Sequence, residues 1–234
     1  MTLPKARPYR FGRDTGDRMT IDGIDQLTRW LKYYVGLAAV PFVFGILSVW
    51  LPFLLLLLIW VGLAGLYLAA IAVTIRWSIA AWATMPLGET MTRRIAAILV
   101  PPALLAAAVL AILPLAPIGG NVGLLSRIAV YHQRFEHIIA TEMARATAER
   151  QGEFDGVTYH VDPGPPVRVA FFPEGLLDNW TALIYDPTGE MMQADGFDPG
   201  TGKFRAPDRV TKLFGGDLVW CRPVWGHYYE CGFT

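Results

Sequence analysis

Hydrophobic positions are concentrated in the first half of the chain, where residues 35–75 contain no ionisable side chain. At about 1.5 Å of rise per residue, one straight helix of this length would be about twice as long as a bilayer core is thick. Pro52 lies inside the run, and a proline neither continues a helix nor donates a backbone hydrogen bond. The pattern therefore predicts two spanning helices, 35–50 and 53–75, that turn at Pro52.

A third uncharged run, residues 95–116, is long enough to cross the bilayer once more. It contains Pro101, Pro102 and Pro114, which a membrane helix tolerates when its neighbours satisfy the carbonyls that proline leaves free. Residues 35–116 are therefore predicted to form a three-helix transmembrane region. An odd number of spans would place the two ends of the chain on opposite sides of the membrane.

Positive charge predicts the orientation of these spans. Residues 1–34 contain seven Lys and Arg against four Asp and Glu, and the loop 76–94 contains three Arg and one acid, Glu89. Membrane-flanking segments rich in Lys and Arg are normally cytoplasmic. We therefore expect a cytoplasmic N-terminus and a C-terminal domain outside the cytoplasmic (inner) membrane, which is the periplasm in a Gram-negative cell.

The segment 1–34 divides into two parts. Its beginning is polar and interrupted by Pro and Gly, which predicts a cytoplasmic tail, and the apolar run that follows is too long for a cleavable signal. From Ile21 onward, apolar residues recur at helical spacing. Two interpretations of this second part stay open: a helix lying along the headgroups, or the first turns of the first span.

Residues 117–150 predict a linker helix. Pro117 and the Gly119–Gly120 pair are expected to end the third span and release the chain from the membrane. Either the following sheet or a second copy of the helix would cover its apolar face, and Glu142 interrupts the coiled-coil pattern, which favours the sheet. The residues that form this face are Leu124, Ile128, Tyr131, Phe135, Ile138 and Ile139.

Residues 151–234 change to an alternating pattern, which predicts strands. The segment 186–189 has the composition of a type I turn, so residues 180–194 are expected to form a hairpin. Together with the linker helix, these elements predict a small α+β domain with one long helix on an antiparallel sheet. The elements expected are strands 156–161, 167–172, 180–185 and 190–194, a short helix at 207–214 and a hairpin over 217–233.

Charge and cysteine content limit what this domain can bind and where it resides. Residues 151–234 contain six Lys and Arg against twelve Asp and Glu, a net charge of −6, so no nucleic-acid partner is expected. Cys221 and Cys231 are equidistant from Gly226, and a hairpin centred there would place them opposite each other. We therefore predict a disulfide between them, which suits a compartment outside the cytoplasm.

The domain offers few candidates for catalysis. His160 and Asp162 lie on the same side of a predicted strand end and would suit an acid/base pair, with Glu174 in a later loop. Each of these side chains also has an ordinary role in a turn or cap. His132 and His137 are five residues apart, whereas zinc-binding histidines on one helical face are expected four apart, so neither a metal nor a cofactor is expected.

The predicted spans contain no ionisable side chain, which argues against a transport path through the membrane. The function expected is a membrane-anchored extracytoplasmic interaction or assembly module, rather than an enzyme, with the lipid bilayer and a membrane or envelope protein as partners. The alternative is a membrane-tethered periplasmic hydrolase that uses the three candidate side chains above. A deep pocket joining them would favour the hydrolase, and a shallow surface with exposed Trp180, Trp225 and Tyr228 would favour the binder.

Overall fold

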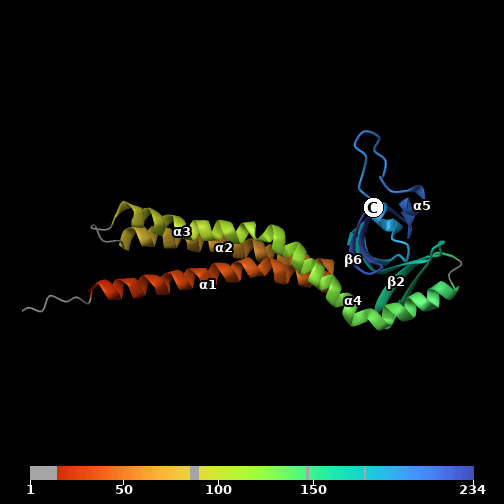
Figure 1. Cartoon of the computed structure of the whole chain (residues 1–234), viewed down its shortest axis with the longest axis horizontal. Coiled ribbons are helices and arrows are strands. Elements are labelled where there is room, and N and C mark those ends of the chain that lie inside the picture. The colour runs from red at the N-terminus through yellow and green to blue at the C-terminus, as the bar shows by residue number, and fades with distance from the viewer. Residues whose placement is uncertain (1–14, 85–89, 146–147, 177) are drawn as a thin grey trace, which may run out of the picture. The chain divides into compact units, whose positions relative to one another are not determined.

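The computed structural model describes residues 15–84, 90–145, 148–176 and 178–234 (Figure 1). Three helices in it are long and apolar enough to cross a membrane, and the chain is a membrane protein by this criterion. They are followed by a domain in which one long helix packs on a seven-stranded antiparallel sheet. The predicted fold class, three transmembrane helices followed by a small α+β domain, is confirmed. Residues 1–14 of the predicted tail lie outside the described residues.

Helices α1 and α2 are longer than the predicted spans, and the third predicted span, 95–116, is divided between α3 and the start of α4. Helix α1 runs without interruption from the polar N-terminal segment into the first apolar run, so the stretch after Ile21 forms the first turns of a spanning helix. Helix α2 continues beyond residue 75, so the predicted loop 76–94 is largely helical, and its residues 85–89 are not described. The bounds are α1 (Thr15–Trp50), α2 (Phe53–Thr84), α3 (Met91–Leu110) and α4 (Ile112–Arg145).

Helix α4 passes through the position where a break was predicted. Pro117, Gly119 and Gly120 are all inside it. The glycines serve a close helix crossing instead, because a Cβ on Gly45 of α1 would lie 2.3 Å from the carbonyl oxygen of Ala116 and 2.8 Å from the amide nitrogen of Gly120. Small residues allow membrane helices to approach in this way. Gly65 and Ala69 of α2 are also two small residues four positions apart, and both are exposed.

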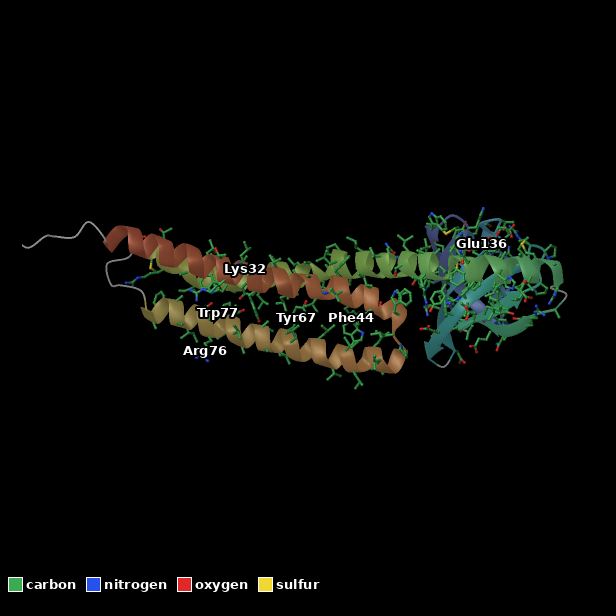
Figure 2. The ribbon with its side chains drawn as sticks, turned by 90° about the horizontal axis from the view of Figure 1, so that it is seen from below. Lys32, Phe44, Tyr67, Arg76, Trp77 and Glu136 are labelled. Carbon is green, nitrogen blue, oxygen red and sulfur yellow. A yellow bond between two sulfur atoms is a disulfide. The ribbon has the colours of Figure 1, made fainter. Side chains whose placement is uncertain are left out.

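Hydroxyl groups in the spanning helices form hydrogen bonds with a neighbouring helix. The hydroxyls of Tyr34 and Thr74 lie 2.5 Å apart, and Tyr67 donates a hydrogen bond to the carbonyl of Leu37. Tyr67 and Trp77 lie between α2 and α1, and the Trp77 ring packs against Trp30, Tyr33 and Tyr34 (Figure 2). Buried polar groups need such partners in a membrane. These hydroxyls therefore join α1 and α2.

The sheet of the C-terminal domain has the order β1-β2-β3-β4-β7-β6-β5, and all of its pairings are antiparallel. Each of its faces covers a hydrophobic core. The strands are β1 (Arg150–Phe154), β2 (Val157–Asp162), β3 (Arg168–Leu176), β4 (Asn179–Tyr185), β5 (Lys212–Leu213), β6 (Gly216–Trp225) and β7 (Tyr228–Phe233). A short helix α5 (Asp208–Thr211) precedes β5.

Helix α4 covers one face of the sheet, as its apolar pattern predicts. Ile128, Phe135, Ile138 and Ile139 are buried against side chains of β2, β3, β4 and β7, and the Phe135 and Phe171 rings stack with their centroids 4.1 Å apart. In Figure 1 the second half of α4 lies beside β2. The sheet therefore takes the place that a second copy of the helix would have filled.

Two strand predictions are corrected. Residues 150–154 form strand β1, whereas the sequence pattern placed residue 150 in the linker helix and predicted no strand before residue 156. Residues 190–193 form a 3₁₀ helix, η1 (Glu190–Gln193), where a fourth strand was predicted, and β4 pairs with β7 instead. The buried carboxylate of Asp186 is the reason, because it accepts the Met191 N–H at 3.0 Å and so turns the chain away from the sheet.

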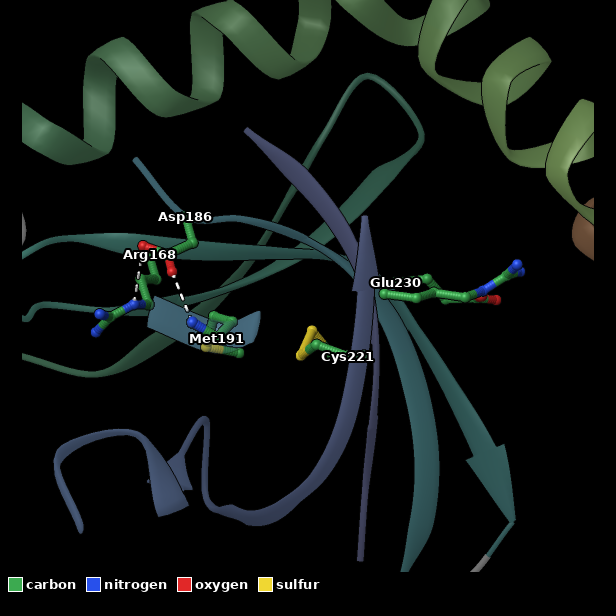
Figure 3. The surroundings of a disulfide bond; sticks show 7 residues. Arg168, Asp186, Met191, Cys221 and Glu230 are labelled. Atoms are coloured by element: carbon green, nitrogen blue, oxygen red, sulfur yellow. Dashed lines mark hydrogen bonds and ion pairs between the residues drawn. A yellow bond between two sulfur atoms is a disulfide. The ribbon is translucent and has the colours of Figure 1, made fainter. Parts of the chain in front are cut away.

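The predicted disulfide between Cys221 and Cys231 is present in the hairpin of β6 and β7 (Figure 3). The two cysteines are register partners with a Cα separation of 4.1 Å. The hairpin is not fully symmetric about Gly226, since a register shift falls between Pro223 and Trp225. That irregularity lies between the cysteines and the turn and leaves the cysteine pairing intact.

Candidate functional site

His160 lies in β2 with its imidazole mostly buried. Its side chain exposes 12% of its surface, and Nε2 lies 3.2 Å from Oε1 of Glu149. The ring also packs on Phe214, with the two centroids 5.6 Å apart. Burial lowers the pKa of His160, and the carboxylates of Glu149 and Asp162 oppose this only in part. The imidazole is therefore mainly neutral at pH 7.

This lowered pKa predicts a pH dependence of stability. The unfolded chain binds a proton at position 160 near pH 6.5, whereas the folded chain resists it, so the stability from this site is complete above that pH and falls as the pH is lowered. We expect the melting temperature of the wild type to fall more steeply between about pH 7 and pH 5 than that of His160→Gln. Parallel melting curves for the two proteins across this range would contradict the assignment.

Asp162 has a local role at the end of β2. Its Oδ1 accepts the Gly164 N–H at 2.9 Å, which closes a turn of the type that aspartate commonly forms. Its charge acts on the His160 ring, but it does not line the hollow that contains His160. The sequence-based alternative of a simple turn residue therefore agrees with its contacts.

Glu174 lies in β3 and not in a loop. Its Oε1 is 2.9 Å from Nη2 of Arg127 on α4, and it lines a hollow of about 120 Å³ that does not include His160. Among the hollows that the described residues form, His160 and Glu174 therefore line different ones, and Asp162 closes a turn. An acid/base pair and a third carboxylate would have to share one site to act on one substrate.

The sheet curls so that its two ends approach each other. Strands β1 and β5 are the end strands, yet Phe214, immediately after β5, packs on His160 of β2. A Cβ on Gly215 would lie 3.9 Å from Oε1 of Glu149, just before β1. The sheet thus resembles a barrel that is left open along one line, with polar side chains at the opening.

A hollow of about 560 Å³ follows this opening, and we call it the seam groove. Its β1 side is polar and exposed, and its opposite side is aromatic. Trp180 is held in place there by a stack on Phe233, with centroids 4.0 Å apart and planes 6° apart. The residues used here to define the seam groove are Gln151, Glu153, Thr158, His160, Trp180 and Phe214.

The aromatic residues proposed as a binding surface differ in exposure. Trp180 is half-buried and lines the seam groove, and Trp225 exposes 54% of its surface. Tyr228 is only 4% exposed, because it packs on Phe135 and belongs to the core under α4. The expected aromatic surface is therefore limited to separate positions, and only Trp180 belongs to the groove.

Sequence patterns did not predict that Phe214, Gln151 and Glu153 lie close together. Gln151 and Glu153 were outside any predicted strand, and Phe214 was placed at the end of a short helix. Their proximity depends on the curl of the sheet, for which no local pattern gives a signal. Within the described residues, no three His, Cys, Asp or Glu side chains are grouped so as to hold a metal ion.

No family model matches the chain, and no curated protein or solved structure is significantly similar to it.

Proposed function

We propose that this protein is a membrane-anchored interaction module whose C-terminal domain binds an extended segment of a partner protein in the seam groove. The single observation that carries the proposal is the free edge of β1 beside that groove. In the described part of the chain, β1 pairs with β2 alone and ends the sheet. An unpaired edge offers backbone N–H and C=O groups to an added strand, and an adjacent groove receives the side chains of that strand.

The lining of the seam groove indicates the chemistry of the segment. Trp180 and Phe214 give apolar contact on one side, and the carboxylate of Glu153 lies at the β1 side. A second carboxylate, that of Glu149, pairs with His160 of the groove. Residues 151–234 carry a net charge of −6. An extended segment with alternating apolar and cationic side chains complements both features.

The proposal also places the domain outside the cytoplasmic membrane, with the N-terminus in the cytoplasm. The excess of Lys and Arg in residues 1–34 and in the segment 76–94 supports this orientation, and the Cys221–Cys231 disulfide fits an oxidising compartment. The indole of Trp50 donates a hydrogen bond to Ser126 at 3.0 Å, so the turn after α1 lies beside the helix that leads into the domain.

The alternative of a membrane-tethered periplasmic hydrolase has less support. It needs His160, Asp162 and Glu174 to act on one substrate, whereas Glu174 lines a separate hollow and pairs with Arg127. The seam groove is wide and open, and His160 is the one candidate of the three that lines it. These contacts favour binding over hydrolysis.

Site-specific photo-crosslinking in native membranes tests the proposed function. A photoreactive amino acid replaces Thr158, an exposed residue of the seam groove, in the full chain. We expect one discrete adduct with a second protein. Glu153→Lys should reduce its yield by about tenfold, because a reversed charge repels a cationic segment and 1.4 kcal/mol corresponds to that factor.

The matched control places the same photoreactive group at Asp198, in the surface loop that precedes α5. This position should give no such adduct. Equal adducts at both positions, or none at Thr158, would contradict binding in the groove. Turnover of a soluble ester or peptide that is lost in His160→Gln would support the hydrolase instead.

A further inference from the structure

A second hollow, independent of the seam groove, lies where the end of α1 meets α4 and the sheet. It has a volume of about 120 Å³ and is polar for its size. We call it the base hollow. The residues used here to define it are Ser48, Arg127, Phe172, Glu174, Thr181 and Glu230. They come from α1, α4, β3, β4 and β7.

The end of the first span indicates that the base hollow lies near the level of the lipid headgroups. Ser48 and Val49, which both line it, belong to the last turn of the span Leu27–Trp50. A helix of 24 residues is about 36 Å long, slightly more than a hydrocarbon core of about 30 Å, so its end reaches the headgroup region. Trp50, which ends the span, is a residue type typical of that region.

A neighbouring face of α4 also has features that are typical of the headgroup level. The exposed ring of Trp225 lies over a mainly apolar hollow of about 250 Å³ that Leu125, Ile128, Ala129 and His132 complete. Leu125 directly precedes Ser126, the partner of Trp50. An exposed tryptophan one or two turns above a membrane helix suits the interface between lipid and water.

Arg127 gives the base hollow an unused hydrogen-bond donor. Its side chain is 14% exposed, and its guanidinium pairs with Glu174 through Nη2 and lies 3.8 Å above the centre of the Phe172 ring. Within the described residues, its Nε is buried without a hydrogen-bond partner. A buried donor without a partner is unfavourable, so a bound group that accepts from it is favoured.

The charges around the base hollow balance. Arg127 is paired with Glu174, and Glu230 is paired with Arg222, which also donates to Asn121. Two guanidinium groups and two carboxylates leave no net charge for an anionic lipid to neutralise. A ligand that carries both a phosphate and a hydrogen-bonding ammonium group complements this set.

We infer that the base hollow binds the phosphoethanolamine headgroup of a lipid from the surrounding bilayer. Arg127 donates to the phosphate, and the carboxylates of Glu174 and Glu230 accept from the ammonium group. A hollow of about 120 Å³ has room for several water-sized groups, so it receives the polar headgroup and leaves the acyl chains in the bilayer.

Competition between lipids tests this inference on the full chain. The purified protein is placed in nanodiscs with equal amounts of phosphatidylethanolamine, phosphatidylcholine and phosphatidylglycerol, and the lipids that it retains are counted by native mass spectrometry. We expect one ethanolamine lipid to be retained about tenfold over the other two. The choline headgroup lacks N–H donors, and the glycerol headgroup lacks a cation.

Arg134 provides a matched control on the same helix. Like Arg127 it pairs with a carboxylate, that of Asp155, and lies over an aromatic ring, that of Tyr131. Arg127→Gln should remove the preference for the ethanolamine lipid, and Arg134→Gln should keep it. Glu230→Gln, which preserves the side-chain shape, should weaken the same preference by several-fold.

The outcomes separate this site from the proposed partner groove. Equal retention of the three lipids, a preference for phosphatidylglycerol, or an unchanged preference in Arg127→Gln would overturn the inference, whatever the result at Thr158. The comparison of lipids on the wild type requires no variant, so it decides the question even where a substitution lowers stability.

Discussion

Replacing Asp186 by alanine is expected to lower the free energy of unfolding of the C-terminal domain by about 3–5 kcal/mol. Asp186 is fully buried, and its carboxylate accepts hydrogen bonds from the Met191 N–H and from the N–H and hydroxyl of Thr188. It also lies 3.3 Å from the Nε of Arg168, whose side chain is 3% exposed (Figure 3). The variant would leave a buried guanidinium with one acidic partner, Glu190.

The pKa of Asp186 agrees with this role. Burial by itself would raise the pKa, but the hydrogen bonds from Met191 and Thr188 and the charge of Arg168 outweigh it and lower the pKa overall. The ionised carboxylate is thus the form that the fold stabilises. Its contribution is present above the ordinary pKa of aspartate and is lost as the pH falls through the lowered value.

Thermal unfolding of the full chain in detergent, followed by near-ultraviolet circular dichroism, measures the effect of Asp186→Ala. We expect the melting temperature of the domain to fall by about 10 °C or more. Asp198→Ala is the matched control, since Asp198 accepts two backbone N–H groups in a surface loop and should cost about 1 kcal/mol or less. Equal losses in the two variants would show that burial of the Asp186 network adds nothing.

The second large effect is expected at Gly45. A side chain there meets the backbone of α4 at Ala116 and Gly120, so Gly45→Leu must push α1 and α4 apart. Overpacking of this kind typically costs about 1–3 kcal/mol, and more when the obstacle is backbone that cannot rotate away. Gly123→Leu should act similarly, because its Cβ would lie 2.9 Å from the carbonyl oxygen of Ile46.

Gly65→Leu is the control for this experiment. Gly65 belongs to another spanning helix and has open space around its Cβ position, so the same substitution should leave stability nearly unchanged. Thermal unfolding in a mild detergent compares the three variants with the wild type. If Gly45→Leu and Gly65→Leu have the same melting temperature, the close crossing of α1 and α4 does not stabilise the packing of these helices.

Local sequence patterns were sufficient to predict the presence of the spanning helices and of most strands, but not where the helices begin and end. The length of the uncharged runs gave the spans, because a bilayer core requires about twenty apolar residues per helix. The spacing of Ile128, Phe135 and Ile139 gave the face of α4 that packs on the sheet. The symmetric positions of Cys221 and Cys231 gave the disulfide, since a tight hairpin makes sequence spacing equivalent to spatial register.

Tertiary structure decided the features that carry function. The chain does turn at residues 186–189, as predicted. Because Asp186 is buried beside Arg168, the chain then continues into η1 and not into a fourth strand. Phe214 reached His160 because the sheet curls, and Glu174 was drawn to Arg127 of α4 instead. Such contacts join residues far apart in the chain, and periodicity describes only neighbours along one element. Sequence therefore determined the elements of this protein, and packing determined which side chains share a groove.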